Sequence, residues 1–208
     1  VDDVSGIFTS NEMNDREFAK TASIMKMVLN RYAAAGCITM GGYDYHTGNR
    51  SAGENRDRRA GRCIGACLNY AQRLNSPLMI YVFSDGSVAS NGMRDESPDN
   101  GSQLGGRAKG QWTGDNSSTA CSFFLVFNPA GKPSPIISGR QIGRYSSDAS
   151  VVTSSSPAAN NVNLLVNTVL LNYMALNNDI GQFASKFSNH GLGSGTSYTQ
   201  YVAFEPII

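Results

Sequence analysis

The sequence has few charges and an almost even balance of sign, which argues against two classes of partner. Charged residues make up 16% of the 208 positions, and 17 Lys and Arg nearly match 16 Asp and Glu, for a formal net charge of +1. A chain without an excess of one sign has no broad electrostatic field to attract nucleic acid or an anionic membrane surface. We therefore expect neither as a partner.

Long apolar segments and common catalytic motifs are also missing. The longest apolar runs, 78–83 and 123–127, are strand-sized, whereas a membrane helix needs roughly 20 apolar residues. The chain has no GxSxG, P-loop, HExxH or dinucleotide-binding motif. The cysteines form no CxxC pair and no Cys/His ligand set, so we expect buried thiols that behave as small apolar side chains. They are Cys37, Cys63, Cys67 and Cys121.

The composition suggests an exported protein. Lysine is scarce beside arginine, and serine, asparagine and glycine are abundant, a mix that occurs in exported and virion proteins as well as in ordinary enzymes. The sequence begins at Val1, so a targeting signal would not be visible in it. We expect an extracytoplasmic setting, periplasmic or secreted.

The first half of the chain has the pattern of an α/β protein. Asn14 or Asp15 can cap a helix with a 3.6-residue apolar period that Gly36 would end, and 37–40 is typical of a short strand. A second helical stripe runs from Ala60 to Leu74, and Gly61 and Gly65 would let that helix approach a sheet closely. The apolar run 78–83 lacks alternation, as a central strand does. Strand, helix and strand in this order predict a right-handed parallel crossover.

The second half adds a long polar loop, further strands and a very apolar helix. Residues 86–120 predict a structureless loop, 121–129 a buried strand, and 138–146 a strand nearer an edge. A third helix, with Pro157 at its first position, extends through Asn177 and is apolar nearly all round, so it is buried or meets a partner. The Gly/Ser-rich tail 191–208 ends in a late strand or an arm. We expect one α/β domain over 1–208, with a mostly parallel sheet flanked by helices.

Three polar side chains follow predicted strands at the edge where such a sheet binds ligands. Asp44 and His46 follow the strand 37–40, and Asp85 follows the strand 78–83. Carboxylate and imidazole together suit zinc, or manganese if oxygen ligands dominate. Asp115 and His190 are possible additional ligands. The alternative is structural: Asp44 caps a turn, His46 bonds to backbone, Asp115 forms an Asx turn, and His190 faces solvent.

Arginines and a tryptophan near these positions have two interpretations each. Arg50 and Arg56, with the arginines at 58, 59 and 62, could hold phosphate or sulfate beside Asp44 and His46. The sequence favours the alternative, a solvated helix face offset by neighbouring acids. The single tryptophan, Trp112, could stack on a sugar or a base, or anchor the polar loop.

The order of these motifs resembles the carboxyl-terminal half of the alkaline phosphatase/sulfatase superfamily. "GYDYH" (42–46) is similar to the Gly-Phe-Asp-Thr-His of its Tat-exported, sulfatase-like branch of unknown function, and "YVFSDG" (81–86) to its Phe-Ser-Glu-Phe-Gly. The similarity covers roughly residues 36–176. It implies that Asp44 and His46 belong to a metal-site element and that Asp85 is a second carboxylate.

The chain also departs from that superfamily. Gly86 replaces a histidine ligand, "GQWTGDNSS" (110–118) stands where the branch has Thr-Asp-His-Gly, and the half that brings the Ser, Thr or Cys nucleophile is absent from this sequence. Hydrolysis of this type needs a nucleophile poised on metal, so the sequence predicts a chain that is inactive alone.

Three functions follow from these observations. The first is a degenerate, non-catalytic sulfatase- or phosphatase-like protein with a structural or assembly role outside the cytoplasm. It would bind protein partners, or a second copy of itself, through the third helix or the carboxyl-terminal arm. The second is a metal-dependent phosphate- or sulfate-ester hydrolase completed by a missing amino-terminal part. The third is a glycan-binding module that uses Trp112.

Overall fold

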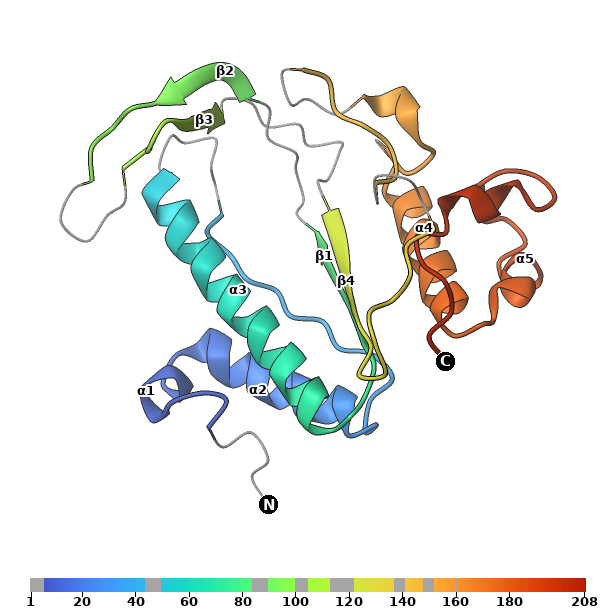
Figure 1. Ribbon diagram of the computed structural model, residues 1–208, viewed down its shortest axis with the longest axis horizontal. Helices are drawn as coiled ribbons and strands as arrows, with labels where there is room; N and C mark the ends of the chain where they lie inside the picture. The colour runs from blue at the N-terminus through green and yellow to red at the C-terminus, as the bar shows by residue number, and fades with distance from the viewer. Residues whose placement is uncertain are drawn as a thin grey trace. The chain divides into compact units, whose positions relative to one another are not determined.

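The structure, a computed structural model, describes residues 6–43, 50–83, 90–99, 105–112, 122–136, 141–147, 152–159 and 161–208 (Figure 1). The chain divides into two compact units. Unit 1 contains Val1–Ile80 and Val126–Gly131, and unit 2 contains Tyr81–Leu125 and Lys132–Ile208. The division passes through two paired strands, β1 (Leu78–Phe83) and β4 (Ser122–Phe127). The single domain that the sequence predicts stays a prediction.

Unit 1 begins with two capped helices. The short helix α1 (Ser10–Met13) starts with a capping box, in which Thr9 and Glu12 each bond to the other's backbone N–H. The helix α2 (Arg16–Leu29) starts at Asp15, whose side chain accepts from the Glu17 N–H. The cap and periodicity predicted from the sequence for this helix are confirmed, although the helix ends before Gly36.

The long helix α3 (Arg50–Arg73) begins ten residues before the predicted start at Ala60. The segment 50–53, predicted as loop, is therefore helical. The prediction that Gly61 and Gly65 let this helix approach a sheet is wrong, because no atom lies within 4 Å of where a Cβ of either residue would be. The closest packing comes instead from Ala66 and Tyr70, both fully buried.

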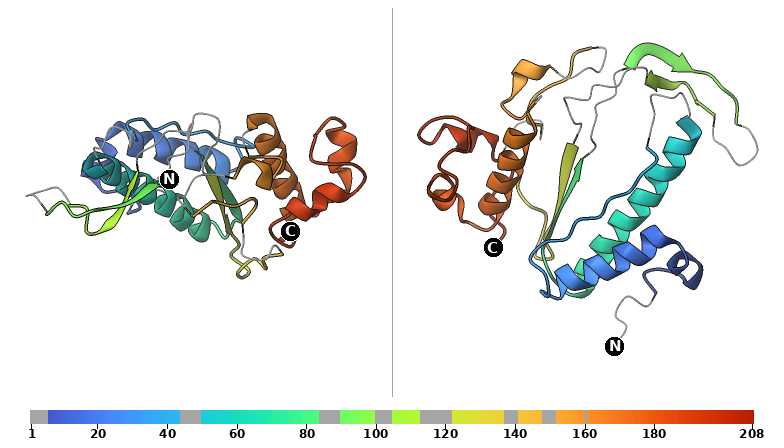
Figure 2. Two further views of the ribbon diagram at one scale, coloured as in Figure 1. Left: turned by 90° about the horizontal axis from the view of Figure 1, so that it is seen from above. Right: turned by 180° about the vertical axis from the view of Figure 1, so that it is seen from behind.

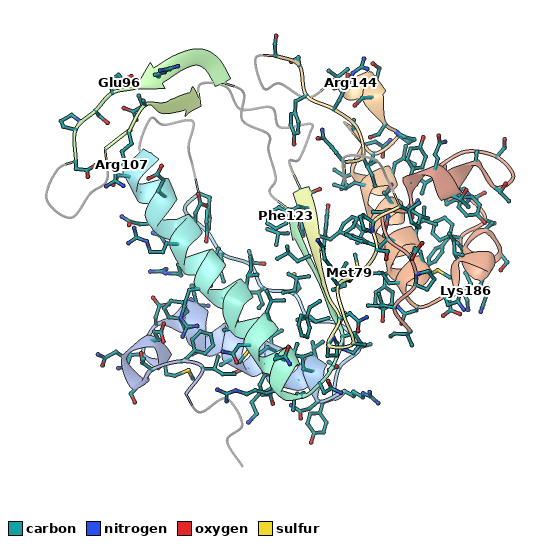
Figure 3. The ribbon with its side chains drawn as sticks, viewed as in Figure 1. Met79, Glu96, Arg107, Phe123, Arg144 and Lys186 are labelled. Atoms are coloured by element: carbon teal, nitrogen blue, oxygen red, sulfur yellow. The ribbon has the colours of Figure 1, made fainter. Side chains whose placement is uncertain are left out.

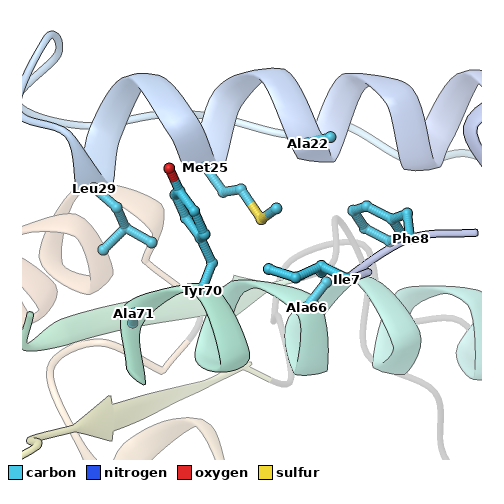
Figure 4. Close-up of a cluster of buried hydrophobic side chains, with 8 residues drawn as sticks. All are labelled: Ile7, Phe8, Ala22, Met25, Leu29, Ala66, Tyr70 and Ala71. Carbon is cyan, nitrogen blue, oxygen red and sulfur yellow. The ribbon is translucent and has the colours of Figure 1, made fainter. Parts of the chain in front are cut away.

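The core of unit 1 lies between α2 and α3, which lie against each other in both views of Figure 2. Its buried side chains come from the two helices and from the segment before α1 (Figure 4). They are Ile7, Phe8, Ala22, Met25, Leu29, Ala66, Tyr70 and Ala71. Leu78 of β1 and Phe127 of β4 pack against this cluster. Burial of such apolar surface, about 25 cal/mol per Å², is what holds the two helices together.

The α/β composition is confirmed, but the described strands form two small sheets. β1 pairs with β4, and β2 (Ser90–Asp95) pairs antiparallel with β3 (Lys109–Trp112). The described residues contain no mostly parallel sheet. The prediction of a strand over 37–40 is wrong: these residues form no strand, and the Thr39 carbonyl accepts from Lys20 Nζ at 2.6 Å.

The predicted polar loop 86–120 contains the hairpin of β2 and β3. Its register pairs Ser90 with Trp112 and Asp95 with Lys109, with an irregularity between Ser90 and Arg94. The Asp95 carbonyl accepts from the Ala108 N–H at 3.0 Å, which closes the strand ends. The prediction of a structureless connection is therefore wrong for this part of the loop.

Unit 2 is built on the helix α4 (Val162–Leu176), which is capped by Asn161 and starts five residues after Pro157. A 3-10 helix, η3 (Thr153–Ser155), precedes it. Residues 141–144, within the segment predicted as an edge strand, form no strand. One face of α4 is buried, but it is not the predicted one, because Val162, Val166 and Tyr173 are exposed. The buried face consists of Thr168, Leu171, Asn172, Ala175 and Leu176.

The carboxyl-terminal segment folds over α4 as short helical turns. They are η4 (Ile180–Gln182), α5 (Phe183–Lys186) and η5 (Ser197–Tyr201). Their apolar side chains form a second core with α4: Leu171, Ala175, Phe183, Leu192, Tyr198 and Val202. The late strand predicted in 191–208 is reduced to one antiparallel bridge, between Pro135 and Phe204.

Candidate functional site

The predicted metal ligands cannot be placed in the fold. Asp44, His46, Asp85 and Asp115 all lie outside the described residues. Among the residues that are described, no group of three or more His, Cys, Asp or Glu side chains could hold a metal ion. The zinc or manganese site, and the hydrolase that would use it, therefore stay predictions.

One edge of the predicted site is visible, where Arg56 of α3 lies beside the "GGY" segment that precedes Asp44. A Cβ at Gly42 would lie 3.0 Å from the Arg56 Cζ, and Gly42 has a φ of +87°, which glycine adopts without strain. The Tyr43 hydroxyl donates to the Arg56 carbonyl at 3.1 Å, and burial raises the pKa of Tyr43. The structure thus places Arg56 beside this segment, and its role as an anion contact near Asp44 and His46 stays a prediction. Arg50 is the first residue of α3, and its side chain lies outside the described part.

Two arginines further along α3 have carboxylate partners, although their side chains remain 33% and 37% exposed. The guanidinium of Arg59 lies 3.2 Å from Asp15, the cap of α2. Arg62 pairs with Glu12 of α1, with its Nε 2.7 Å from Oε1. These two arginines therefore tie α3 to the amino-terminal segment and are not available to a ligand.

His190 is buried and structural, which corrects the interpretation of a histidine facing solvent. Only 7% of its surface is exposed, and its ring packs against those of Phe183 and Tyr198, with centroids 5.0 and 5.2 Å away. Its Nδ1 accepts from the Leu192 N–H at 3.0 Å. Because Nδ1 is an acceptor here, a neutral ring carries its proton on Nε2. His190 helps to fold the tail of unit 2 in this arrangement.

The thiols differ in exposure, so the prediction of buried cysteines is only partly correct. Cys63 is buried and Cys67 is half-buried on α3, but Cys37 is exposed. Burial raises the pKa of Cys67 to about 11 and also raises the pKa of Cys63. A raised pKa keeps both as thiols near neutral pH, so neither is an activated nucleophile.

The structure describes a cavity of about 310 Å³ within unit 2. Its walls are the ends of β1 and β4, the segment 141–145, the turn 155–159, one flank of α4 and the tail residues 203–204. Small-molecule sites typically occupy about 300–1,000 Å³ and combine an apolar lining with a few polar groups. This cavity fits the lower end of that range.

Aromatic side chains form one wall of the cavity. Phe123 and Phe124 of β4 and Phe204 of the tail line it, and the rings of Phe124 and Phe204 meet edge to face with centroids 6.0 Å apart. Phe123 remains 51% exposed (Figure 3). The packed pair fixes the shape of the wall, whereas Phe123, the neighbour of Phe124 on the strand, points its ring to the opposite face of the sheet.

Polar groups lie on the opposite wall and at its base. The Ser155 hydroxyl oxygen accepts from the Arg144 N–H at 2.9 Å, and that of Ser156 accepts from the Ala159 N–H at 3.2 Å. The Tyr81 hydroxyl is buried and has no hydrogen bond of good geometry in the described structure. Burial raises the pKa of Tyr81, and the nearby Ser122 hydroxyl opposes this rise. Sequence reasoning missed this site because its residues come from segments up to 120 positions apart.

The third predicted contact residue, Trp112, is the last residue of β3, and its side chain lies outside the described part. The glycan-binding function stays a prediction for that reason. No helix in the described ranges has the length and apolar composition needed to cross a bilayer.

Comparison of the chain with protein-family models, with curated proteins and with solved structures finds no match in any of the three. The resemblance to the sulfatase-like superfamily therefore stays a prediction from the motifs.

Proposed function

We propose that this chain is a non-catalytic assembly protein that associates with a second copy of itself through the exposed face of α4. The observation that carries the proposal is the exposure of three apolar side chains along this helix: 69% for Val162, 50% for Val166 and 52% for Tyr173. Their spacing of four and seven residues places them on one face. A contiguous exposed apolar patch commonly marks a protein–protein contact.

The apolar surface continues at the end of the helix. The Leu176 carbonyl in the last turn of α4 accepts from the N–H groups of Ile207 and Ile208, at 2.9 and 3.3 Å. Ile208, which is 70% exposed, is thereby held at the carboxyl-terminal end of the same helix. The carboxyl-terminal arm, which the sequence predicts for assembly together with the helix, thus adds an exposed apolar side chain at the end of α4 in unit 2.

Charge favours a second copy as the occupant of this surface. None of the 15 residues of α4 is charged. In a two-fold dimer the same patch meets itself, so a charged patch would repel its copy, whereas a neutral apolar patch does not. Nothing in α4 offers the complementary charge that would select a charged partner.

The test is the mass of the purified 208-residue chain by analytical ultracentrifugation across a range of concentrations. We expect a reversible dimer for the native chain and a monomer for Val166→Asp, because an aspartate in the interface would be buried without a partner. The matched control is Asn163→Asp, which adds the same charge at an exposed polar position of the same helix and should leave the dimer intact. A native chain that stays monomeric at every concentration would rule the proposal out.

The origin of the scaffold is a further part of this proposal. We infer an extracytoplasmic protein whose fold derives from the sulfatase-like superfamily and has lost the metal site. The support is the "GYDYH" and "YVFSDG" motifs, together with Gly86 in place of a histidine ligand. According to this proposal, the fold is retained because its surface mediates association, and not because it holds a metal.

A further inference from the structure

The cavity in unit 2 has more free hydrogen-bond donors than acceptors. Ser155 and Ser156 use their hydroxyl oxygens to accept from backbone N–H groups, so each can still donate its own proton. The Tyr81 hydroxyl is buried without a hydrogen bond of good geometry to any described residue. A buried polar group without a partner is unfavourable, so a bound acceptor would improve this site. Each of these three residues lines the cavity and keeps a hydroxyl proton that it can donate to a bound acceptor.

The charge on the described side chains that line the cavity is positive. Arg144 is the one charged residue among the described residues that line the cavity, and its guanidinium makes no ion pair with any described residue. Its backbone is fixed on both sides, because its N–H donates to Ser155 Oγ and its carbonyl accepts from the Val152 N–H at 3.0 Å. Gly143, with a φ of +80°, brings this segment so close that a Cβ would lie 3.0 Å from Ser155 Oγ. An arginine on a fixed backbone beside free donors is suited to a carboxylate.

The rest of the lining is apolar and suits a ring. The Phe124–Phe204 pair presents ring edges and faces, and Leu165 and Val169 of α4 complete the wall. Aromatic rings prefer offset-stacked or edge-to-face contacts, both of which such a wall can provide. A bare inorganic anion would leave this wall unused.

We propose that this cavity binds a small aromatic carboxylate, with its ring against the Phe124 and Phe204 wall and its carboxylate on the side of Arg144, Ser155 and Ser156. The volume of about 310 Å³ limits the ligand to a single ring with a short chain. This site is independent of the assembly face, since the cavity uses Leu165, Thr168 and Val169 of α4 and not Val162, Val166 or Tyr173.

The experiment measures the affinity of three probes for the full chain by isothermal titration calorimetry. 3-Phenylpropionate has both ring and charge, 3-phenyl-1-propanol has the ring alone, and propionate has the charge alone. We expect 3-phenylpropionate to bind at least about tenfold more tightly than either of the others, because loss of one charge-assisted contact commonly costs a factor of this order. Equal binding of the acid and the alcohol, or no binding of the acid, would overturn the proposal.

Variants locate the site. Arg144→Gln should weaken 3-phenylpropionate by about tenfold or more, whereas Lys186→Gln, which removes a positive charge from the exposed end of α5, should not change its affinity (Figure 3). Val169→Phe fills the cavity from α4 and should abolish binding; circular dichroism checks that each variant is folded. An acid that binds native, Arg144→Gln and Val169→Phe chains equally would contradict the assignment.

Discussion

The guanidinium of Arg62 on α3 contacts both carboxylate oxygens of Glu12 on α1, with Nε 2.7 Å from Oε1 and Nη2 3.0 Å from Oε2. The same guanidinium donates to the Ile7 carbonyl and lies 4.9 Å from the centre of the Phe8 ring. Ile7 and Phe8 belong to the core of unit 1. One arginine therefore connects the amino-terminal segment to α3 through a bidentate ion pair, a backbone hydrogen bond and a ring contact.

This ion pair predicts a pH dependence in the acid range. The hydrogen bond from Arg62, followed by that from the Thr9 N–H, lowers the pKa of Glu12 from 4.5 to about 2. Because the folded-state pKa is the lower one, the stabilisation is present above pH 4.5 and is lost as the pH falls from 4.5 towards 2. We expect Glu12→Gln to unfold at a lower temperature than the native chain at neutral pH, and the difference to vanish near pH 2.

Thermal melts followed by circular dichroism at a series of pH values measure this effect. The control is Glu96→Gln, which removes an exposed carboxylate with no ion pair to a described residue and should change the melting temperature little at any pH. A Glu12→Gln deficit that is the same at pH 7 and pH 2 would show that the stabilisation is not electrostatic.

Asn172 predicts how the tail is held to α4. This side chain is 1% exposed; its Nδ2 donates to the carbonyls of Thr168 and Tyr201, both at 2.9 Å, and its Oδ1 accepts from the Ala203 N–H at 2.8 Å. Asn172→Leu leaves the Tyr201 carbonyl and the Ala203 N–H without this partner, at a cost of about 1–3 kcal/mol per buried group. We expect a corresponding loss in the free energy of unfolding by urea.

The matched control is Asn163→Leu, the same substitution at an exposed position of the same helix. It should change the free energy of unfolding by no more than about 0.5 kcal/mol, as is usual for surface positions. Hydrogen exchange at Ala203 should accelerate in Asn172→Leu alone. Equal effects of the two substitutions would mean that the side chain of Asn172 does not hold the tail.

Caps, apolar periods and apolar runs in the sequence correctly predicted the helix and strands that depend on interactions within one segment. The cap at Asp15 and the apolar period after it specify α2, and the unbroken apolar runs specify β1 and β4. The start of α3 was missed because its first ten residues have no apolar stripe, although they include arginine, glutamate and alanine, which favour helix. The run 37–40 is apolar enough for a strand, but no neighbouring strand pairs with it in the described structure.

Contacts between distant positions could not be predicted in this way. The strands β2 and β3 contain few apolar residues, and their pairing depends on the register between Asp95 and Lys109. Arg62 and Glu12 are 50 positions apart, so their ion pair has no signal in either segment alone. The residues of the candidate cavity come together only when the tail folds onto α4, and for the predicted ligands Asp44, His46 and Asp85 the structure gives no placement.

The close approach of the strand ends in the hairpin predicts that Gly106 cannot be replaced by a residue with a Cβ without separating them. A Cβ at Gly106 would collide with the Asp95 carbonyl and carboxylate, whereas a Cβ at Gly61 on α3 would meet no atom within 4 Å. We expect Gly106→Ala to speed hydrogen exchange at the Ala108 N–H, which bonds to Asp95, because the strand ends must separate. Gly61→Ala should instead stabilise the chain by about 1 kcal/mol, as alanine favours helix over glycine. Unchanged exchange at Ala108 in Gly106→Ala would contradict this close approach.

Our proposal that the metal site has been lost predicts a chain without stoichiometric zinc or manganese. Gly86 stands where the superfamily has a histidine ligand, so at most Asp44, His46 and Asp85 remain of the motif, whereas structural zinc sites ordinarily have four protein ligands. Elemental analysis of the native chain and of Asp44→Ala, after exposure to each metal and gel filtration, measures this. One metal per native chain that disappears in Asp44→Ala would revive the hydrolase.

The most direct test of association through α4 is hydroxyl-radical footprinting of the purified chain at low and high concentration, read by mass spectrometry. Tyr173 on α4 is 52% exposed and Tyr32, after α2, is 82% exposed, so one chemistry reports on both. Our account predicts that oxidation of Tyr173, with that of Val162 and Val166, falls as the chain is concentrated while oxidation of Tyr32 stays constant. Oxidation of Tyr173 that does not change with concentration would contradict it.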